Sequence, residues 1–277
     1  MLAAISMLLF ASFAIADSAD AQTLLEGKIE HSESLPPVDS QWQVGAKFDA
    51  ARLPVTGSGT VIWWRVPDWL AGTWHNIGKV KRLSLKDIEH EEKSQGFDAV
   101  DVKYPDAEII GYQKDRENAV WTCVPAPYVG RTVQGDNTNV SIIYSATPVD
   151  INENQVVIRF LATTLTVEKG KGKIVSVSQR ESLQTYKPIE KNHILVQASM
   201  KFFDENGAAR FESKVLSQCA RIEGFRETPY LPTPANVPTL IDMRKSFDNF
   251  LRRQKLDRLI PERYPLAPVQ GYQMISI

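Results

Sequence analysis

The feature that most constrains the fold of this chain is a series of strand-like segments separated by short turn-forming stretches. Each segment is rich in β-branched or aromatic residues, and no helical pattern is interleaved between them. Strands joined by short turns form an antiparallel meander, whereas a parallel sheet needs helical crossovers. The predicted strands are Glu108–Gln113, Ala119–Val124, Val140–Thr147, Gln155–Val167, Lys173–Glu181, His193–Phe203 and Ala209–Ile222.

The strongest turn signal is Asn206-Gly207, which stands between the last two of these segments. This pair favours the left-handed backbone of a two-residue hairpin. In the segment before it, Ile194, Val196 and Phe202 share one parity and alternate with more polar residues. Period-two patterning of this kind predicts a strand with one buried face and one solvated face.

One helix is predicted, over about residues 240–259, and Pro261 ends it. Its apolar face is formed by Leu240, Met243, Phe247, Phe250 and Leu251. The predicted organisation is a signal segment (1–21), an extended N-terminal segment (22–59), a β domain (60–227), a proline-rich connector (228–239), and the helix with its tail (240–277). Trp42 is expected to attach the N-terminal segment to the β domain.

The first 21 residues have the pattern of a secretory signal. An uncharged apolar run to Phe13 is followed by small residues, and Ala19-Asp20-Ala21 fits cleavage after Ala21. Cleavage removes Asp17 and Asp20, which changes the formal net charge from −1 to +1. This balance argues against nucleic acid as a partner. We expect a secreted or periplasmic protein, the alternative being an uncleaved anchor or a buried helix.

Two cysteines, Cys123 and Cys219, lie far apart in strand-like segments. In an oxidising compartment a single pair most simply forms one disulfide. The alternative is two buried free thiols. Neither cysteine has a Cys-x-x-Cys partner or a nearby histidine, which argues against redox catalysis and zinc binding.

Four of the six tryptophans fall within residues 63–74, a cluster that either fills a core or lines a binding site. Trp63 and Trp64 are adjacent, so a strand places their side chains on opposite faces. At most one of them is therefore expected in the core. The other is the first place to look for a functional surface.

The cluster ends in Gly72-Thr73-Trp74, after a short turn that contains Trp69-Leu70-Ala71. This opening, followed by a meander of roughly eight strands and then a helix, resembles the lipocalin and wider calycin group. The resemblance implies an all-β fold, an antiparallel up-and-down β-barrel with one C-terminal α-helix. It gives Gly72 and Trp74 structural roles, with Trp74 across the barrel base near a basic residue from the end of the chain. It also implies an apolar cavity for a small hydrophobic molecule, and a strand-to-late-chain disulfide is common in the group.

No catalytic or metal site is predicted, and the cofactor is unknown. The chain has no Gly-x-Ser-x-Gly, no Ser-x-x-Lys and no phosphate-binding glycine loop. Its histidines are scattered at His31, His75, His90 and His193. His75 follows Trp74 directly and is expected on the outside of its strand.

The leading hypothesis is a lipocalin-like protein that binds or carries a small apolar molecule. The candidate ligand-binding residues are Trp63, Trp64, Trp121, Phe160 and Phe202. The alternative is a non-enzymatic envelope protein that contacts a partner or membrane surface through an exposed Trp63–Trp64 face and the C-terminal helix. An enzyme of unrecognised type would need convergent polar groups with perturbed protonation in a cleft.

Overall fold

The computed structural model describes residues 30–55, 61–77, 80–88, 93–94, 99–100, 108–232, 239–263 and 273–275. The predicted signal segment, residues 1–21, lies outside the described residues. The chain divides into two compact units, Met1–His31 and Ser32–Ile277. All the strands and helices described below belong to the second unit.

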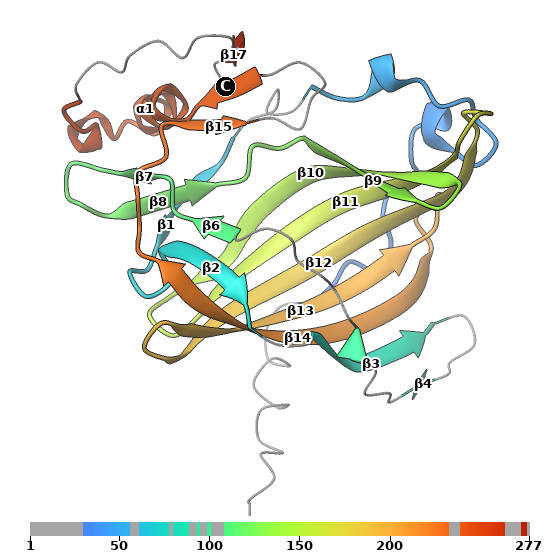
Figure 1. The fold of residues 1–277 in the computed structure, drawn as a ribbon, viewed down its shortest axis with the longest axis horizontal. Coiled ribbons are helices and arrows are strands. Elements are labelled where there is room, and N and C mark those ends of the chain that lie inside the picture. The colour runs from blue at the N-terminus through green and yellow to red at the C-terminus, as the bar shows by residue number, and fades with distance from the viewer. Residues whose placement is uncertain are drawn as a thin grey trace, which may run out of the picture. The chain divides into compact units, whose positions relative to one another are not determined.

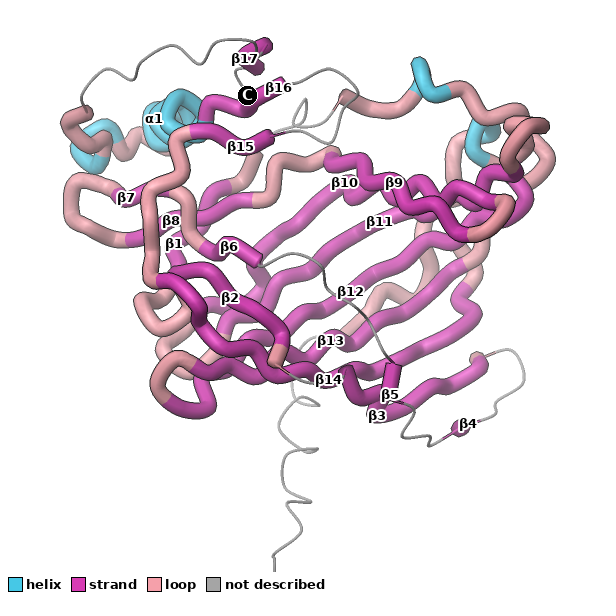
Figure 2. The backbone as a smooth tube through the Cα atoms, viewed as in Figure 1, coloured by secondary structure: helices cyan, strands magenta, loops and turns pink. Residues whose placement is uncertain are grey.

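The second unit is mostly antiparallel β-structure, and its main sheet curls into a half-barrel (Figures 1 and 2). Neighbouring strands follow the order β4 (Lys93–Ser94), β3 (Val80–Asp87), β14 (Ala209–Glu223), β13 (His193–Phe203), β12 (Ile174–Glu190), β11 (Val156–Glu168), β10 (Asn137–Ile151) and β9 (Tyr128–Gln134). The short strands β2 (Gly72–Asn76), β5 (Ala99–Val100) and β6 (Glu108–Ile110) pair alongside this path. The predicted antiparallel meander is confirmed.

Both ends of this sheet differ in detail from the expectation. Among the described residues no ladder joins β9 back to β3 or β4, so the sheet is a half-barrel. At the other end, β2 and β3 are two separate strands that pair with successive parts of β14. Strand β9 was not predicted, because it is an edge strand whose second half is exposed and which lacks apolar alternation.

The predicted hairpin at Asn206-Gly207 is confirmed between β13 and β14, but residues 204–208 form its connection, which is longer than a two-residue turn. The Asp204 carboxylate accepts hydrogen bonds from the backbone N–H groups of Asn206 and Ala208, both at 2.9 Å. Gly207 has φ +84°, and a Cβ there would lie 1.7 Å from the carbonyl oxygen of Leu35. The glycine therefore serves both the turn and the close passage of the N-terminal segment.

The N-terminal segment from Ser32 packs on the outer side of the sheet. It contains two 3₁₀ turns, η2 (Ser40–Trp42) and η3 (Ala50–Arg52). Trp42 is only 5% exposed and packs in a cluster with Val140, Ile142 and Leu165 of β10 and β11. The predicted role of Trp42 as the attachment point is confirmed.

Two small sheets and the single α-helix complete the unit. One sheet has the order β1 (Trp63–Val66), β8 (Val120–Cys123) and β7 (Gln113–Lys114). The other joins β15 (Tyr230–Pro232), β16 (Thr239–Asp242) and β17 (Gln273–Ile275), so the predicted connector 228–239 includes strand structure. The described residues contain no helix long and apolar enough to cross a membrane.

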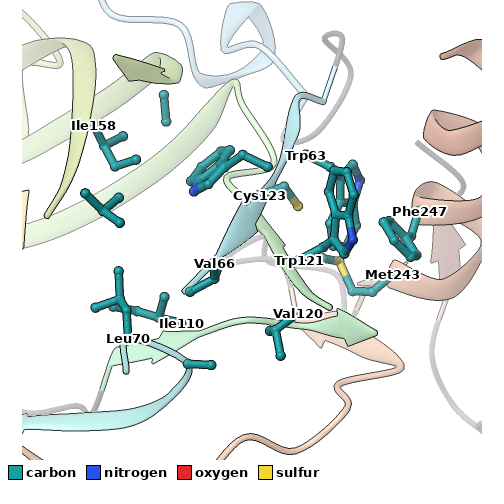
Figure 3. Packing of buried hydrophobic residues seen from close by; sticks show 14 of the residues in the cluster. Trp63, Val66, Leu70, Ile110, Val120, Trp121, Cys123, Ile158, Met243 and Phe247 are labelled. Carbon is teal, nitrogen blue, oxygen red and sulfur yellow. The ribbon is translucent and has the colours of Figure 1, made fainter. Parts of the chain in front are cut away.

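The helix α1 (Met243–Arg253) is shorter than the predicted 240–259, because Leu240 lies in β16 and Asp242 caps the helix by accepting from the Lys245 N–H. Its apolar side chains are buried against the three-stranded sheet of β1, β7 and β8. The ring centroid of Phe247 is 4.9 Å from that of Trp63 and 5.5 Å from that of Trp121. The helix thus extends the core at one end of the half-barrel (Figure 3).

Candidate functional site

The two faces of the main sheet are distinguished by strand register. Val156, Tyr186, Val196 and Ser217 are successive partners across β11, β12, β13 and β14, so their side chains share one face. We call this the inner face, because its base packs in the same core as β1, β2 and β8. The opposite, outer face carries the N-terminal segment.

The inner face changes character along the strands. At its base, Ile158, Ile194 and Val196 are buried in the core. Farther along, Phe160, Met200 and Phe202 share the same face but are only half-buried. The inner face therefore presents apolar side chains beyond its filled base.

The base is held by Trp74 on β2 and Arg221 on β14. Trp74 is 2% exposed, and its indole Nε1 donates to the Leu70 carbonyl at 2.8 Å. The Arg221 guanidinium lies over the Trp74 ring, with Cζ 4.9 Å from the ring centroid, and donates to the carbonyls of Asp68 and Trp69. Strand β2 and its preceding turn are thereby tied to the last strand of the meander.

Gly72 is required by the backbone at this point. Its φ is +143°, and a Cβ there would lie 2.6 Å from the carbonyl oxygen of Glu223. A side chain at this position would separate β2 from β14. Gly72 and Trp74 are thus both held by close contacts with β14 and the preceding turn.

A carboxyl group stands beside this base. Glu108 on β6 is the register partner of Trp74, and its carboxylate accepts a hydrogen bond of 3.1 Å from the hydroxyl of Tyr186. Glu108 keeps solvent access at the short strand β6, whereas Tyr186 is buried. Desolvation by the surrounding protein raises the pKa of Glu108, and the Tyr186 hydrogen bond acts in the opposite direction.

The groups around Glu108 are neutral at ordinary pH. Burial, reinforced by the Glu108 charge, raises the pKa of Tyr186 and that of Tyr112. Burial and then the Glu108 charge raise the pKa of Cys219 to about 11. Glu108, Tyr112, Tyr186 and Cys219 are thus an electrostatically coupled group built from four strands or loops.

The expected disulfide is wrong: Cys123 and Cys219 are both free. Cys123 lies in β8 of the small sheet, 2% exposed, and Cys219 lies on β14 of the main sheet. Both belong to the same apolar core, but the two strands do not bring the sulfur atoms to bonding distance. Burial raises the pKa of the Cys123 thiol, as expected for an inert core cysteine.

The predicted ligand residues divide into two groups. Phe160 and Phe202 lie on the inner face, where a ligand could reach them. Trp121 does not, because it is buried between β8 and α1, with its Nε1 donating to Asp115 at 2.9 Å. Its environment is that of a core residue.

The expectation that one of Trp63 and Trp64 is free of the core is wrong. Trp63 is 3% exposed, and its Nε1 donates to Ser246 at 3.3 Å. Trp64 is 7% exposed and belongs to the same core cluster. Strand β1 lies between Ile158 of the curled sheet and Phe247 of the helix, so both of its faces are covered (Figure 3). The exposed tryptophan face on which an envelope partner was expected to dock is therefore absent.

Sequence reasoning did not identify Glu108 or Tyr186 as site residues. Glu108 was placed at the start of a predicted strand, but nothing local pairs it with a residue 78 positions later. The strand Lys173–Glu181 was predicted too short, which left Tyr186 outside it. Strand β12 continues to Glu190, but Thr185 and Tyr186 are both buried, so no period-two pattern marks Tyr186 as an inward residue.

The structure forms no metal centre from the described residues, since no three His, Cys, Asp or Glu side chains converge. His75 is exposed, as expected from its position after Trp74. His75 and His193 both pair with Ala220 in register and lie on the outer face, away from the group around Glu108.

No model of a known protein family matches this chain, and neither a curated protein nor a solved structure matches it.

Proposed function

We propose that this protein binds the apolar part of a small molecule on the inner face of its half-barrel, in the manner of a lipocalin-like carrier. The observation that carries the proposal is the half-burial of Phe160, Met200 and Phe202 on the face that curls inward. Removing a large apolar side chain fully from water lowers the free energy by about 1.5–3 kcal/mol. Three such side chains on one face supply the driving force for a small apolar ligand.

The base of the half-barrel supports the same proposal. The lipocalin resemblance implies a Gly-x-Trp tryptophan near a basic residue from the end of the chain. Here the basic residue over Trp74 is Arg221, on the last strand of the meander. The base is filled by core side chains, so the ligand is proposed to lie on the half-buried remainder of the inner face. The exported location is proposed from the signal segment, and N-terminal sequencing of the mature protein is expected to begin at Gln22.

The test is ligand binding by the purified protein and by two variants. Native mass spectrometry is expected to find a copurified apolar molecule, and an environment-sensitive apolar dye is expected to bind at a single class of site. Phe202→Ser should weaken dye binding about tenfold, because the change removes apolar contact area from the ligand surface.

The matched control is Val133→Ser on β9, which follows Thr138 and the outer-face residue Val167 in register and is 64% exposed. This variant should bind the dye as the unchanged protein does. Equal weakening by both substitutions, or no dye binding and no copurified molecule, would contradict the proposed function.

A further inference from the structure

We propose that the ligand of the inner face carries a positively charged amine, and that the Glu108 carboxylate is the group that binds it. This inference rests on the proposed function and adds the chemical class of the ligand. It is carried by the placement of one carboxylate beside an apolar surface, with no counter-cation among the described residues.

The Glu108 carboxylate has few partners among the described residues. Its one hydrogen bond within the described part of the chain comes from the Tyr186 hydroxyl, at 3.1 Å. No described lysine or arginine forms an ion pair with it, and the influences on its pKa are burial and Tyr186 alone. Glu108 is exposed, so a cationic group from solution can reach its carboxylate.

Two arginines are candidates for neutralising the charge of the Glu108 carboxylate. Arg221 lies on the other side of Trp74 in register, but its guanidinium is committed to the Trp74 ring and to the carbonyls of Asp68 and Trp69. Arg180 shares the inner face, six residues from Tyr186 along β12, which is about 20 Å of extended strand. Arg180 also makes a contact of its own. Neither guanidinium neutralises Glu108.

The side chains around Glu108 favour a cationic ligand group over an anionic one. Tyr186 donates to the carboxylate, and Tyr112 and Cys219 lie close enough for the Glu108 charge to raise the pKa of each. Tyrosine rings attract cations through their negative faces. The groups facing Glu108 are thus neutral or cation-attracting, and the Glu108 carboxylate would repel an anionic ligand headgroup.

A strip of side chains on β14 connects Glu108 to the apolar part of the inner face. Cys219, Ser217 and Val215 follow one another along the inner face of β14 and are half-buried. They lead from Glu108 to Val215, the register partner of Ala198, over four residues or about 13 Å. An alkyl chain attached to the amine would follow this strip toward Met200.

The experiment compares three amphiphiles of equal chain length, each below its micelle concentration: dodecylammonium, dodecanol and dodecanoate. Affinities are measured by calorimetry for the full-length mature protein, for Glu108→Gln, and for Glu212→Gln. Glu212 is a matched control, because its carboxylate lies on the outer face of β14, 3.6 Å from Lys201. The unchanged protein and E212Q should bind dodecylammonium about tenfold or more tighter than dodecanol.

Glu108→Gln should remove that preference and leave the dodecanol affinity unchanged. Tyr186→Phe, which keeps Glu108 and the ring, should retain the preference if E108Q proves unstable. Equal affinities for dodecylammonium and dodecanol, or tighter binding of dodecanoate, would overturn this inference and leave the proposed function standing. Failure of all three amphiphiles to bind the unchanged protein would overturn both.

Discussion

Arg221 stacks on Trp74, with its Cζ atom 4.9 Å from the indole centroid, and so joins the last strand of the meander to the first. The same guanidinium donates to the carbonyls of Asp68 and Trp69, while Trp74 donates to the Leu70 carbonyl. The turn before β2 is therefore held from both sides. Two residues 147 positions apart in the chain define the base of the half-barrel.

Arg221→Gln is expected to lower the free energy of unfolding by about 1–3 kcal/mol, because it removes the cation–π contact and leaves the turn carbonyls with fewer donors. Urea denaturation measures the effect. Arg226→Gln is the control, since Arg226 is well exposed and its ion pair in the described part of the chain is with Glu223 at 2.8 Å. A loss for R221Q no larger than the control, which should stay within about 0.5 kcal/mol, would refute the importance of the stack.

Gly72→Ala is expected to destabilise the protein by about 2 kcal/mol or more, because alanine disfavours φ +143° and its Cβ would collide with the Glu223 carbonyl. Thermal unfolding detects this as a lower Tm. Gly224→Ala, one residue beyond the end of the same pairing, meets no atom within 4 Å and should change Tm little. Equal Tm values for the two variants would contradict the backbone argument.

The raised pKa of Glu108 predicts a specific pH dependence of stability. Between the ordinary value of 4.5 and the raised folded value, the folded protein binds more protons at this site than the unfolded chain. The contribution of Glu108 to stability is therefore fully present below the unfolded pKa and is lost as pH rises through the folded pKa.

Glu108→Gln removes this titration, while the Gln oxygen can still accept from Tyr186. The difference in unfolding free energy between E108Q and the unchanged protein should shift in favour of E108Q as pH rises from below 4.5 toward neutrality. Urea denaturation at a series of pH values measures the difference. A difference that stays constant across that range would show that burial does not raise this pKa.

The two cysteines are expected to behave as free thiols. A thiol assay after denaturation without reductant should find both, and reductant should leave the Tm unchanged. In the folded protein Cys123 should be unreactive, and Cys219 should react slowly at pH 8, because its pKa is raised to about 11 and little thiolate is present. The absence of reactive thiols after denaturation would instead establish a disulfide.

Much of the fold follows from local sequence. The bounds of β13 match the predicted His193–Phe203, because its alternation is regular and Asn206-Gly207 marks the turn. Strand β9 was missed because a solvated edge strand needs no apolar alternation. The helix was predicted too long because the apolar period continues through Leu240, which the tertiary structure places in β16 instead.

The candidate site was only partly predictable. Phe160 and Phe202 were identified because inward aromatics follow from strand parity. Trp63 and Trp64 were assigned wrongly, because parity tells which residues lie on opposite faces but not whether both faces are covered. Helix α1 covers one face of β1 and the curled sheet covers the other, and nothing near residue 63 in the chain encodes this.

The sequence by itself determined the antiparallel meander, its main hairpin and the Gly-x-Trp opening, since these depend on backbone preferences and on period-two burial. Only the tertiary structure decided that Cys123 and Cys219 stay unbonded, and that Glu108 meets Tyr186 rather than a cation. The physical reason is that alternation fixes the face on which a side chain lies. Which groups meet on that face depends on the register of strands far apart in the chain, and on the curl of the sheet.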